Sequence, residues 1–482
     1  MKINHFIAVL FVSLLVVSCG NNNENRSITD FTSAFVNNNE AVAVFGKIEF
    51  NQILGKADYK SVPKFGNLIE SQLNEFRKVI DTDVPICFAI EGPFSEKGVP
   101  AAFYAFIDVK SVDSLEQNLT QKGYDFEKDG DMNYTRFGEL SLGIEGNLAI
   151  LISKSGNYDS KKDLASAFEQ ANGDVEEGKA TEILNEKGDV VVGLDIESIY
   201  STSNTQLAKL SSAKKKELDA LVANSYSRTT FKFEDGAAII ETKNYFSEAL
   251  KKRMFLKANE KAVILEKLGH GSPRLGFSLN FDMVKLQQLV TDFSPEALNR
   301  LGEQLGGPVQ MALMMGGENA LSGLLNGELG VVMLGEPKGN GSVVPDFNAY
   351  VGFGDKGKSL ADMAKSFLSG GTMLTDINTK GMSFYSSANF APVSGKKLKF
   401  PEGCENFGKK ALTGFINFEG MDVSSLELEG GAKILNIIKY INFEMDENGG
   451  KIVIKAKEGK ENILKQSMQF FLKEFESQIG AI

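Results

Sequence analysis

The stretch from Gly352 to Ser359, GFGDKGKS, matches the phosphate-binding pattern G-x-x-x-x-G-K-[ST] at every defined position. In a loop of this kind, backbone N–H groups and a helix N-terminus hold the phosphates of a nucleotide. Lys358 would neutralise those phosphates, and Ser359 would bind magnesium. A strand-like run, NAYVGF, precedes the stretch and a helix-like run, SLADMAKSFL, follows it. The meaning of the match depends on where the chain resides and how it folds.

Metal binding is the second chemistry that a short stretch suggests. The sequence DGDMN, from Asp129 to Asn133, opens like a calcium loop. Position six of that loop is Tyr134 instead of glycine, and position twelve is Leu140 instead of glutamate, so a hairpin turn explains these residues better. Beyond the first residues the chain has one histidine, His270, and it has no C-x-x-C pair for zinc. We therefore predict neither a metal site nor a cofactor.

The first residues predict export. An uncharged apolar run from Phe6 to Val17 is shorter than the about 20 residues of a membrane-spanning helix and has the length of a secretory signal core. Ser18 and Cys19 then resemble the lipobox of bacterial lipoproteins, although Val17 replaces the more usual Ala, Ser or Thr. That resemblance implies cleavage before Cys19 and acylation of its sulfur and amino group. The alternatives are a soluble secreted protein and an uncleaved anchor.

We therefore predict a lipoprotein signal peptide over residues 1–18, and lipidated Cys19 followed by a flexible polar tether, together residues 19–40. Gly20 gives no signal for inner-membrane retention, so we expect a lipid anchor in the outer membrane, on its periplasmic or surface side. A formal net charge of −11 argues against nucleic-acid partners, which select basic surfaces. No later apolar run reaches about 18 residues, so the anchor is the expected membrane contact.

Two cysteines follow the anchor. A disulfide between them is compatible with an oxidising compartment. We expect two free thiols instead, because Cys87 lies in the apolar run ICFAIEG, where a thiol behaves as a small hydrophobe. Cys404 lies in a polar loop, PEGCENFG.

The chain contains two divergent copies of one pattern. Four blocks recur in the same order, beginning with VFGKIEFNQIL and RLGFSLNFDMV, and chance seldom preserves such an order. Differences in spacing between the blocks fit insertions and deletions in loops. We therefore predict homologous halves over residues 41–250 and 273–482, joined by a helical, basic connector over residues 251–272. The aligned pairs are Gly46 with Gly276, Pro93 with Pro337, Gly193 with Gly414, and Phe233 with Phe443.

Strand and helix patterns alternate within a half. Apolar residues spaced i, i+4, i+7 and i+11 from Ile69 to Ile80 predict a helix, and strand-like runs over residues 86–91 and 101–108 follow it. The turns at Asp235-Gly236 and at Glu447 to Gly450 predict hairpins. Hairpin-joined strands separated by helices indicate the α+β class. We expect each half to be a mainly antiparallel sheet with helices packed on one face.

The lipobox, the Asn-rich tether and the duplicated body together resemble a family of Bacteroidetes lipoproteins classed as domain of unknown function 4836. The resemblance covers nearly all of the chain after the signal, and it rests on layout and on phrases such as SVDSLEQNL and FKFEDGAAIIETKNYF. It implies that the protein is located in the cell envelope and that its body is built from repeats. It carries no established activity and no functional residues.

These observations favour a lipid-anchored envelope protein that acts by binding or as a scaffold, with an envelope protein or a small ligand as its partner. The alternative is an extracytoplasmic, hydrolase-like enzyme with a carboxylate-based site in a cleft between the halves. The chain has 63 acidic residues, and no spacing singles out a catalytic pair among them. We expect a protein without enzymatic activity.

We interpret the phosphate-loop match at Gly352, Gly357, Lys358 and Ser359 as incidental. The first half makes the same strand-to-helix passage, AFIDVKSVDSL, without those glycines. An exported protein has no supply of nucleoside triphosphates, and phosphate loops occur in parallel α/β sheets rather than antiparallel ones. The glycines then serve a tight turn, and Ser359 is expected to cap a helix.

Overall fold

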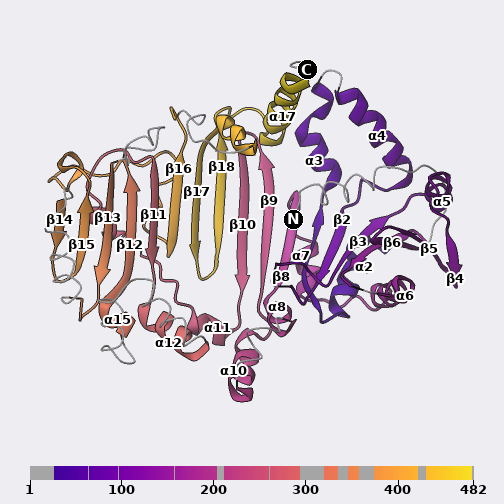
Figure 1. Cartoon of the computed structure of the whole chain (residues 1–482), viewed down its shortest axis with the longest axis horizontal. Helices are drawn as coiled ribbons and strands as arrows, with labels where there is room; N and C mark the ends of the chain where they lie inside the picture. The colour runs from indigo at the N-terminus through magenta and orange to yellow at the C-terminus, as the bar shows by residue number, and fades with distance from the viewer. Residues whose placement is uncertain are drawn as a thin grey trace. The chain divides into compact units, whose positions relative to one another are not determined.

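The computed structural model divides the chain into two compact units, whose helices and strands are drawn in Figure 1. Unit 1 comprises the described residues within 26–209, 222–235 and 461–482, and unit 2 comprises those within 210–221 and 236–460. Each unit contains a set of antiparallel strands and its own apolar core. The structure describes residues 26–62, 65–95, 97–156, 158–202, 211–259, 261–293, 320–334, 346–357, 374–421 and 430–479.

The strands of unit 1 are all antiparallel and follow the order β9-β8-β1-β2-β3-β7-β6-β5-β4. Successive hairpins join β4 to β7, and a left-handed glycine lies in each of their three turns: Gly130 with φ 61°, Gly138 with φ 65° and Gly146 with φ 58°. The strands are β1 Val42–Ile48, β2 Ile86–Glu91, β3 Ala102–Asp108, β4 Glu127–Asp129, β5 Met132–Phe137, β6 Leu140–Glu145, β7 Leu148–Lys154, β8 Val190–Asp195 and β9 Tyr226–Glu234.

Helices cover both faces of the unit 1 sheet rather than the one face that the sequence predicts. Tyr104 and Phe106 of β3 belong to a core built with α2, α6 and α7, whereas Ala105 between them belongs to a core built with α4 and α5. Successive side chains of a strand point to opposite faces, so the two cores lie on opposite sides of the sheet. The helices of unit 1 are α2 Ile28–Asn37, α3 Phe50–Ala57, η1 Tyr59–Ser61, α4 Phe65–Val79, α5 Val112–Gln121, α6 Ser160–Ala171, α7 Lys179–Leu184, α8 Ile196–Thr202 and α17 Ile463–Ile479.

Local sequence signals explain several helix ends. The Ser27 hydroxyl accepts a hydrogen bond from the Asp30 N–H, and the Asp30 carboxylate accepts one from the Ser27 N–H, which forms a capping box at the start of α2. Asp159 caps α6 by accepting from the Lys162 N–H. Asp58 ends α3 in the left-handed conformation, with φ 46°.

The strands of unit 2 are also antiparallel, in the order β10-β18-β17-β16-β11-β12-β13-β15-β14. The α+β class and the antiparallel sheets that the sequence predicts are therefore confirmed. The strands are β10 Ala237–Tyr245, β11 Leu275–Asn280, β12 Leu325–Met333, β13 Phe347–Phe353, β14 Leu374–Ile377, β15 Gly381–Tyr385, β16 Leu412–Asn417, β17 Ile438–Asp446 and β18 Gly449–Ala456. The helices are α10 Ser212–Val222, α11 Glu248–Arg253, η2 Val263–Lys267, α12 Met283–Phe293, α15 Ala320–Leu324, η4 Ala388–Phe390 and η6 Gly430–Ile437.

The predicted connector over residues 251–272 is a part of unit 2 rather than a helical linker. Helix α11 ends at Arg253, and the next helical segment, η2, is a short 3-10 turn. Ile264 and Leu268 are buried in the core of unit 2, against Val332 and Tyr350. Burial of these apolar side chains fixes the segment on the sheet.

The boundaries of the units also differ from those of the predicted halves. Strand β10 lies within the predicted first half, but it pairs with β18 of unit 2 from Ala237–Lys455 to Lys243–Gly449. Helix α17 lies within the predicted second half, but it belongs to unit 1, where Lys465 pairs with Asp58 at 3.1 Å. Each predicted half therefore contributes a terminal element to the other unit.

The two units nevertheless share a strand order. In unit 1 the order β9-β8-β1-β2-β3-β7-β6 corresponds strand for strand to β17-β16-β11-β12-β13-β15-β14 in unit 2. Strand β3 lies between β2 and β7, and β13 lies between β12 and β15, so the two aligned strands occupy equivalent places. Duplication of one ancestral half would produce this correspondence.

Candidate functional site

The phosphate-loop match begins in the last two residues of β13, Gly352 and Phe353, and the backbone donors of the turn after the strand are already hydrogen-bonded within the protein. The Gly354 N–H donates to the Leu324 carbonyl at 2.9 Å, and the Lys356 N–H donates to the Gly323 carbonyl at 2.7 Å. The Gly357 N–H donates back to the Gly354 carbonyl at 2.9 Å. A phosphate would need these same donors. Lys358 and Ser359, the other two predicted contacts, lie outside the described residues.

Close packing accounts for the glycines of this turn. A Cβ on Gly354 would collide with the backbone carbonyl of Ser322, at the neighbouring α15, and a Cβ on Gly357 would collide with Phe353. A Cβ on Gly352 would collide with the side chain of Asn326. The turn therefore needs small residues in order to pack, and this supports the interpretation that the match is incidental.

The residues considered for metal binding have structural roles. The stretch from Asp129 to Asn133 forms the hairpin between β4 and β5, in which Asp129 pairs with Met132. The Nδ1 of His270 lies 2.7 Å from the Ala391 carbonyl oxygen, so this ring nitrogen carries the hydrogen that it donates. Within the described parts of the chain, no three His, Cys, Asp or Glu side chains group as metal ligands.

Cys87 and Cys404 are both free thiols, as the sequence predicts. Each is buried, and burial raises the pKa of each thiol from its ordinary 9.0 to about 12. A buried thiol that stays protonated at neutral pH is a poor nucleophile, because the thiolate is the reactive form. Neither cysteine therefore has the environment of a catalytic nucleophile.

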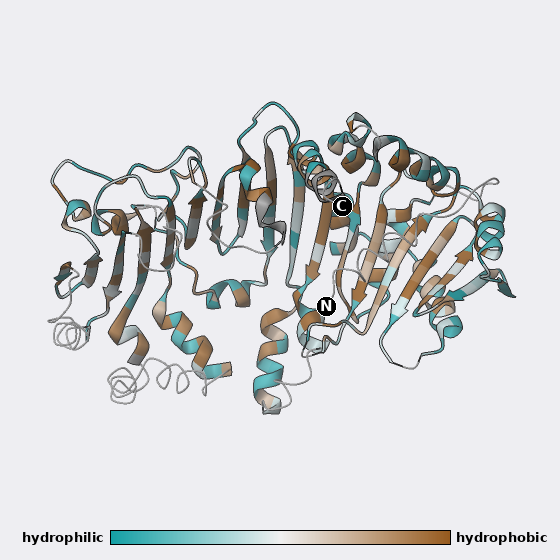
Figure 2. Cartoon of the chain, turned by 45° about the horizontal axis from the view of Figure 1, so that its top comes forward, coloured by the Kyte–Doolittle hydropathy of each residue, from teal (hydrophilic) through white to brown (hydrophobic). Residues whose placement is uncertain are grey.

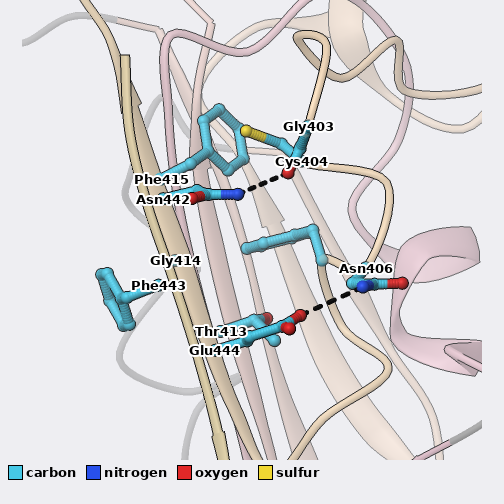
Figure 3. A pocket seen from close by; sticks show the side chains of 10 residues that line it. Gly403, Cys404, Asn406, Thr413, Gly414, Phe415, Asn442, Phe443 and Glu444 are labelled. Atoms are coloured by element: carbon cyan, nitrogen blue, oxygen red, sulfur yellow. Dashed lines mark hydrogen bonds between the residues drawn. The ribbon is translucent and has the colours of Figure 1, made fainter. Parts of the chain in front are cut away.

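A shallow hollow beside Cys404 lies between a loop and strands β16 and β17 (Figure 3). The Asn442 side-chain amide donates to the Gly403 carbonyl, and the Asn406 amide donates to Glu444 at 3.1 Å. The Oδ1 atom of Asn442 is buried and has no partner in the described structure. The other polar groups are used to hold the loop on the sheet, so the hollow has no set of free groups for chemistry.

Three carboxyl groups of unit 1 have raised pKa values, and no local pattern in the sequence selects them. Burial raises the pKa of Asp108, Glu116 and Glu145 in each case. Each accepts a hydrogen bond from a different asparagine, which opposes the shift and satisfies the carboxylate. The three donors are Asn147 for Asp108, Asn133 for Glu116, and Asn172 for Glu145.

One face of the unit 2 sheet carries three rows of apolar cross-strand partners from β13 to β17. Side chains that face one another across antiparallel strands lie on the same face of a sheet, so the register defines each row. We name the three rows together the apolar face of unit 2. The face ends in polar residues, because the first row continues through Gly450 to Thr242 of β10 and the second continues to Thr375 of β14. The rows are Met382-Val351-Leu329-Leu279-Leu412-Met445, Phe384-Ala349-Val331-Phe277-Gly414-Phe443-Ile452-Ile240, and Phe347-Met333-Leu275-Ile416-Ile441-Ile454-Ala238.

Part of this face is accessible in the described structure. Leu329 is 37% exposed, Ile452 is 38% exposed and Met445 is 43% exposed. Figure 2 shows the strands of unit 2 with extensive brown, the colour of hydrophobic residues. The other face carries polar pairs, such as Ser278 and Thr413, whose hydroxyls lie 2.6 Å apart. Contiguous exposed apolar surface is typical of interaction sites.

The comparisons with known proteins give this chain no family. No family model matches it. No curated protein matches it either. Among solved structures, crystal form III of TP0453 matches with a TM-score of 0.27 and 8% identity, over 47% of this chain and 81% of that chain. Crystal form I of TP0453 gives a TM-score of 0.26 and 9% identity, over 46% and 80% of the two chains. Likeness at this level says nothing about function.

The predicted lipidation site, Cys19, lies outside the described residues. None of the described helices combines the length and the apolar character needed to cross a bilayer. Sequence reasoning missed the apolar face, because the register between distant strands is needed to define it. The alternating apolar residues of LGFSLN and INFEMD were the local signal, but each run alone indicates only a half-buried strand.

Proposed function

We propose that this chain is a lipid-anchored protein of the bacterial outer membrane whose folded body binds a partner or serves as a scaffold. Acylation of Cys19 would hold the body at the membrane, and the polar tether through residue 40 would give it reach. The matching strand orders of the two units support a body built by duplication. The partner is an envelope protein or a small apolar ligand.

The apolar face of unit 2 is the observation that carries the binding role. Its three rows run from β13 to β17 without a polar side chain, and Leu329, Met445 and Ile452 are partly exposed. Burial of apolar surface contributes roughly 25 cal/mol per Å², so a partner that covers these rows would gain a large driving force. The described structure contains no comparable constellation of reactive groups.

Photo-crosslinking in the cell envelope tests the binding role. A photoreactive phenylalanine placed at Met445 should form a covalent product with a second molecule after irradiation. The same residue placed at Val393, which is 46% exposed outside the apolar face, is the matched control and should give no such product. If Met445 crosslinks only to other parts of its own chain, the apolar face is an internal surface and the binding role is wrong.

Metabolic labelling tests the anchor separately. A clickable fatty acid should label the parent protein and should fail to label Cys19→Ala. Equal labelling of the two proteins would contradict lipidation at Cys19 and would leave the crosslinking result unaffected.

The enzyme alternative would draw on Asp108, Glu116 and Glu145, because raised carboxyl pKa values are common at catalytic sites. We favour binding, since each of these carboxyl groups is held by its own asparagine. Hydrolysis of a substrate by the purified protein, lost in Glu116→Gln and retained in Glu139→Gln, would reverse that preference.

A further inference from the structure

Four charged side chains of unit 2 form a closed ring that joins three helices. Lys214 of α10 lies 3.1 Å from Glu217 and 3.0 Å from Asp292 of α12. Arg253 of α11 lies 2.5 Å from the same Glu217 and 2.5 Å from the same Asp292. Positive and negative charges therefore alternate around the ring, and each cation contacts both anions. We name these four residues the ion-pair ring.

The ring is built around an aromatic side chain. The Lys214 ammonium lies 5.6 Å from the centroid of the Phe293 ring, and the Arg253 guanidinium lies 5.7 Å from it. Both distances fall within the range of a cation–π contact. Lys214 and Glu217 come from one part of the sequence, Arg253 from a second and Asp292 from a third, so the ring joins distant segments.

Helix α10 has few other means of attachment within the described structure. Leu218, Leu221 and Val222 are its buried apolar residues, the Ser247 hydroxyl donates to the Leu221 carbonyl at 2.7 Å, and most of its remaining side chains are exposed. The helix has 11 residues, and an isolated helix of this length is marginal in water. Attachment to the rest of the protein, which includes the ion-pair ring, therefore keeps α10 helical.

We infer that α10 is a detachable strap, which the ion-pair ring holds on unit 2 and which raised ionic strength releases. The side chains of the ring are 31–38% exposed, so dissolved ions reach them and screen their attraction. Release would free the buried side chains of α10, Leu218 and Leu221, and would remove the Lys214 ammonium from the Phe293 ring. Unit 2 would then present a second apolar surface whose exposure depends on the salt around the protein.

Hydrogen exchange measured by mass spectrometry on the whole protein tests the strap. The Debye length falls from about 30 Å at 0.01 M salt to about 3 Å at 1 M salt, so exchange is compared at these two concentrations. Peptides from α10 should exchange roughly tenfold faster at the higher salt. Peptides from α6, whose Leu164 and Phe168 are buried, serve as the reference and should keep their rate. An α10 rate that does not change with salt overturns the proposal.

Two variants separate the ring from the charge of its helix. Arg253→Gln removes two ion pairs and one cation–π contact, so α10 should exchange roughly tenfold faster at low salt and respond little to further salt. Lys251→Gln removes one charge from the same helix outside the ring, where Lys251 pairs with Glu248, and α10 should keep the parent rate. If both variants accelerate α10 equally, the ring is not what holds it. If Arg253→Gln loosens all of unit 2, the salt comparison on the natural protein decides the question.

Discussion

The Phe415 side chain of β16 lies across from Gly276 of β11, so closely that a Cβ on Gly276 would come within 2.5 Å of its ring. Unit 1 has the same arrangement with the roles exchanged. There, Phe45 of β1 lies across from Gly193 of β8, and a Cβ on Gly193 would come within 2.6 Å of the Phe45 ring. Both phenylalanines are buried in the core of their unit. In both units, therefore, an aromatic ring packs over a glycine at the equivalent strand pair, which is β1–β8 in unit 1 and β11–β16 in unit 2.

This packing predicts opposite effects for two glycine substitutions. Gly276→Ala should lower the free energy of unfolding by about 1–3 kcal/mol, because the added methyl group overpacks the rings of Phe415 and Phe407. Gly55→Ala should raise it by about 0.5 kcal/mol, since Gly55 lies in α3 with no atom within 4 Å of its Cβ position. Urea unfolding measures both values. Equal effects of the two substitutions would contradict the packing at β11 and β16.

The buried thiols should be unreactive until the chain unfolds. Because burial raises the pKa of Cys87 and Cys404 to about 12, almost no thiolate is present at pH 8 in the folded protein. Iodoacetamide should therefore label both residues in urea and neither in buffer, as read by mass spectrometry of the peptides. A Cys87–Cys404 disulfide peptide, or rapid labelling of the folded protein, would show that this prediction is wrong.

The same thiols predict a loss of stability at alkaline pH. A thiol with a pKa of 9.0 in the unfolded chain and about 12 in the folded one stabilises the fold fully below pH 9, and this contribution declines as the pH rises toward 12. Each thiol should remove about 1.4 kcal/mol between pH 7 and pH 10. Urea unfolding under reducing conditions measures the slope, and the Cys87→Ala, Cys404→Ala double variant should show a smaller one. An identical slope in the double variant would assign the effect to other groups, such as Tyr350.

The buried carboxylate of Asp189 should be important for the stability of unit 1. It accepts hydrogen bonds from Lys56 at 2.6 and 2.7 Å and from the Phe233 N–H at 2.6 Å. Asp189→Ala would leave both donors unpaired and should lower the free energy of unfolding by about 3 kcal/mol. Lys78→Ala, which breaks an exposed pair with Glu75, is the control and should cost less than about 1 kcal/mol. Similar losses in the two variants would mean that burial gives Asp189 no special role.

Local sequence patterns predicted the positions of the helices and strands better than they predicted which strands pair. The expected strand over residues 86–91 coincides with β2, and the expected helix from Ile69 to Ile80 lies almost entirely within α4. Both signals come from side-chain periodicity over a few residues. The pairing of β10 with β18 joins residues more than two hundred positions apart, and periodicity contains no information on which strands meet.

Strand β7 contains a local sequence signal for helices on both faces of the unit 1 sheet. Strand β7, LAILISK, is apolar without alternation and is buried along most of its length. A continuous apolar run indicates burial on both faces of a sheet, and a strand covered on one face alternates instead. The apolar face of unit 2 could not be predicted in this way. Each of its strands alternates apolar and polar residues, and only the register between the strands shows that the apolar side chains lie on one face of the sheet.

The turn that follows β13 should not bind nucleotides. The N–H groups of Gly354, Lys356 and Gly357 already donate to backbone carbonyls, so a phosphate would have to break those bonds. Calorimetry of the purified protein with ATP and magnesium should give no binding heat. Gly354→Ala should instead lower stability by about 1–3 kcal/mol, because its methyl group would collide with the Ser322 carbonyl. Micromolar ATP binding that disappears in Lys358→Ala would establish a nucleotide site and overturn the packing explanation for these glycines.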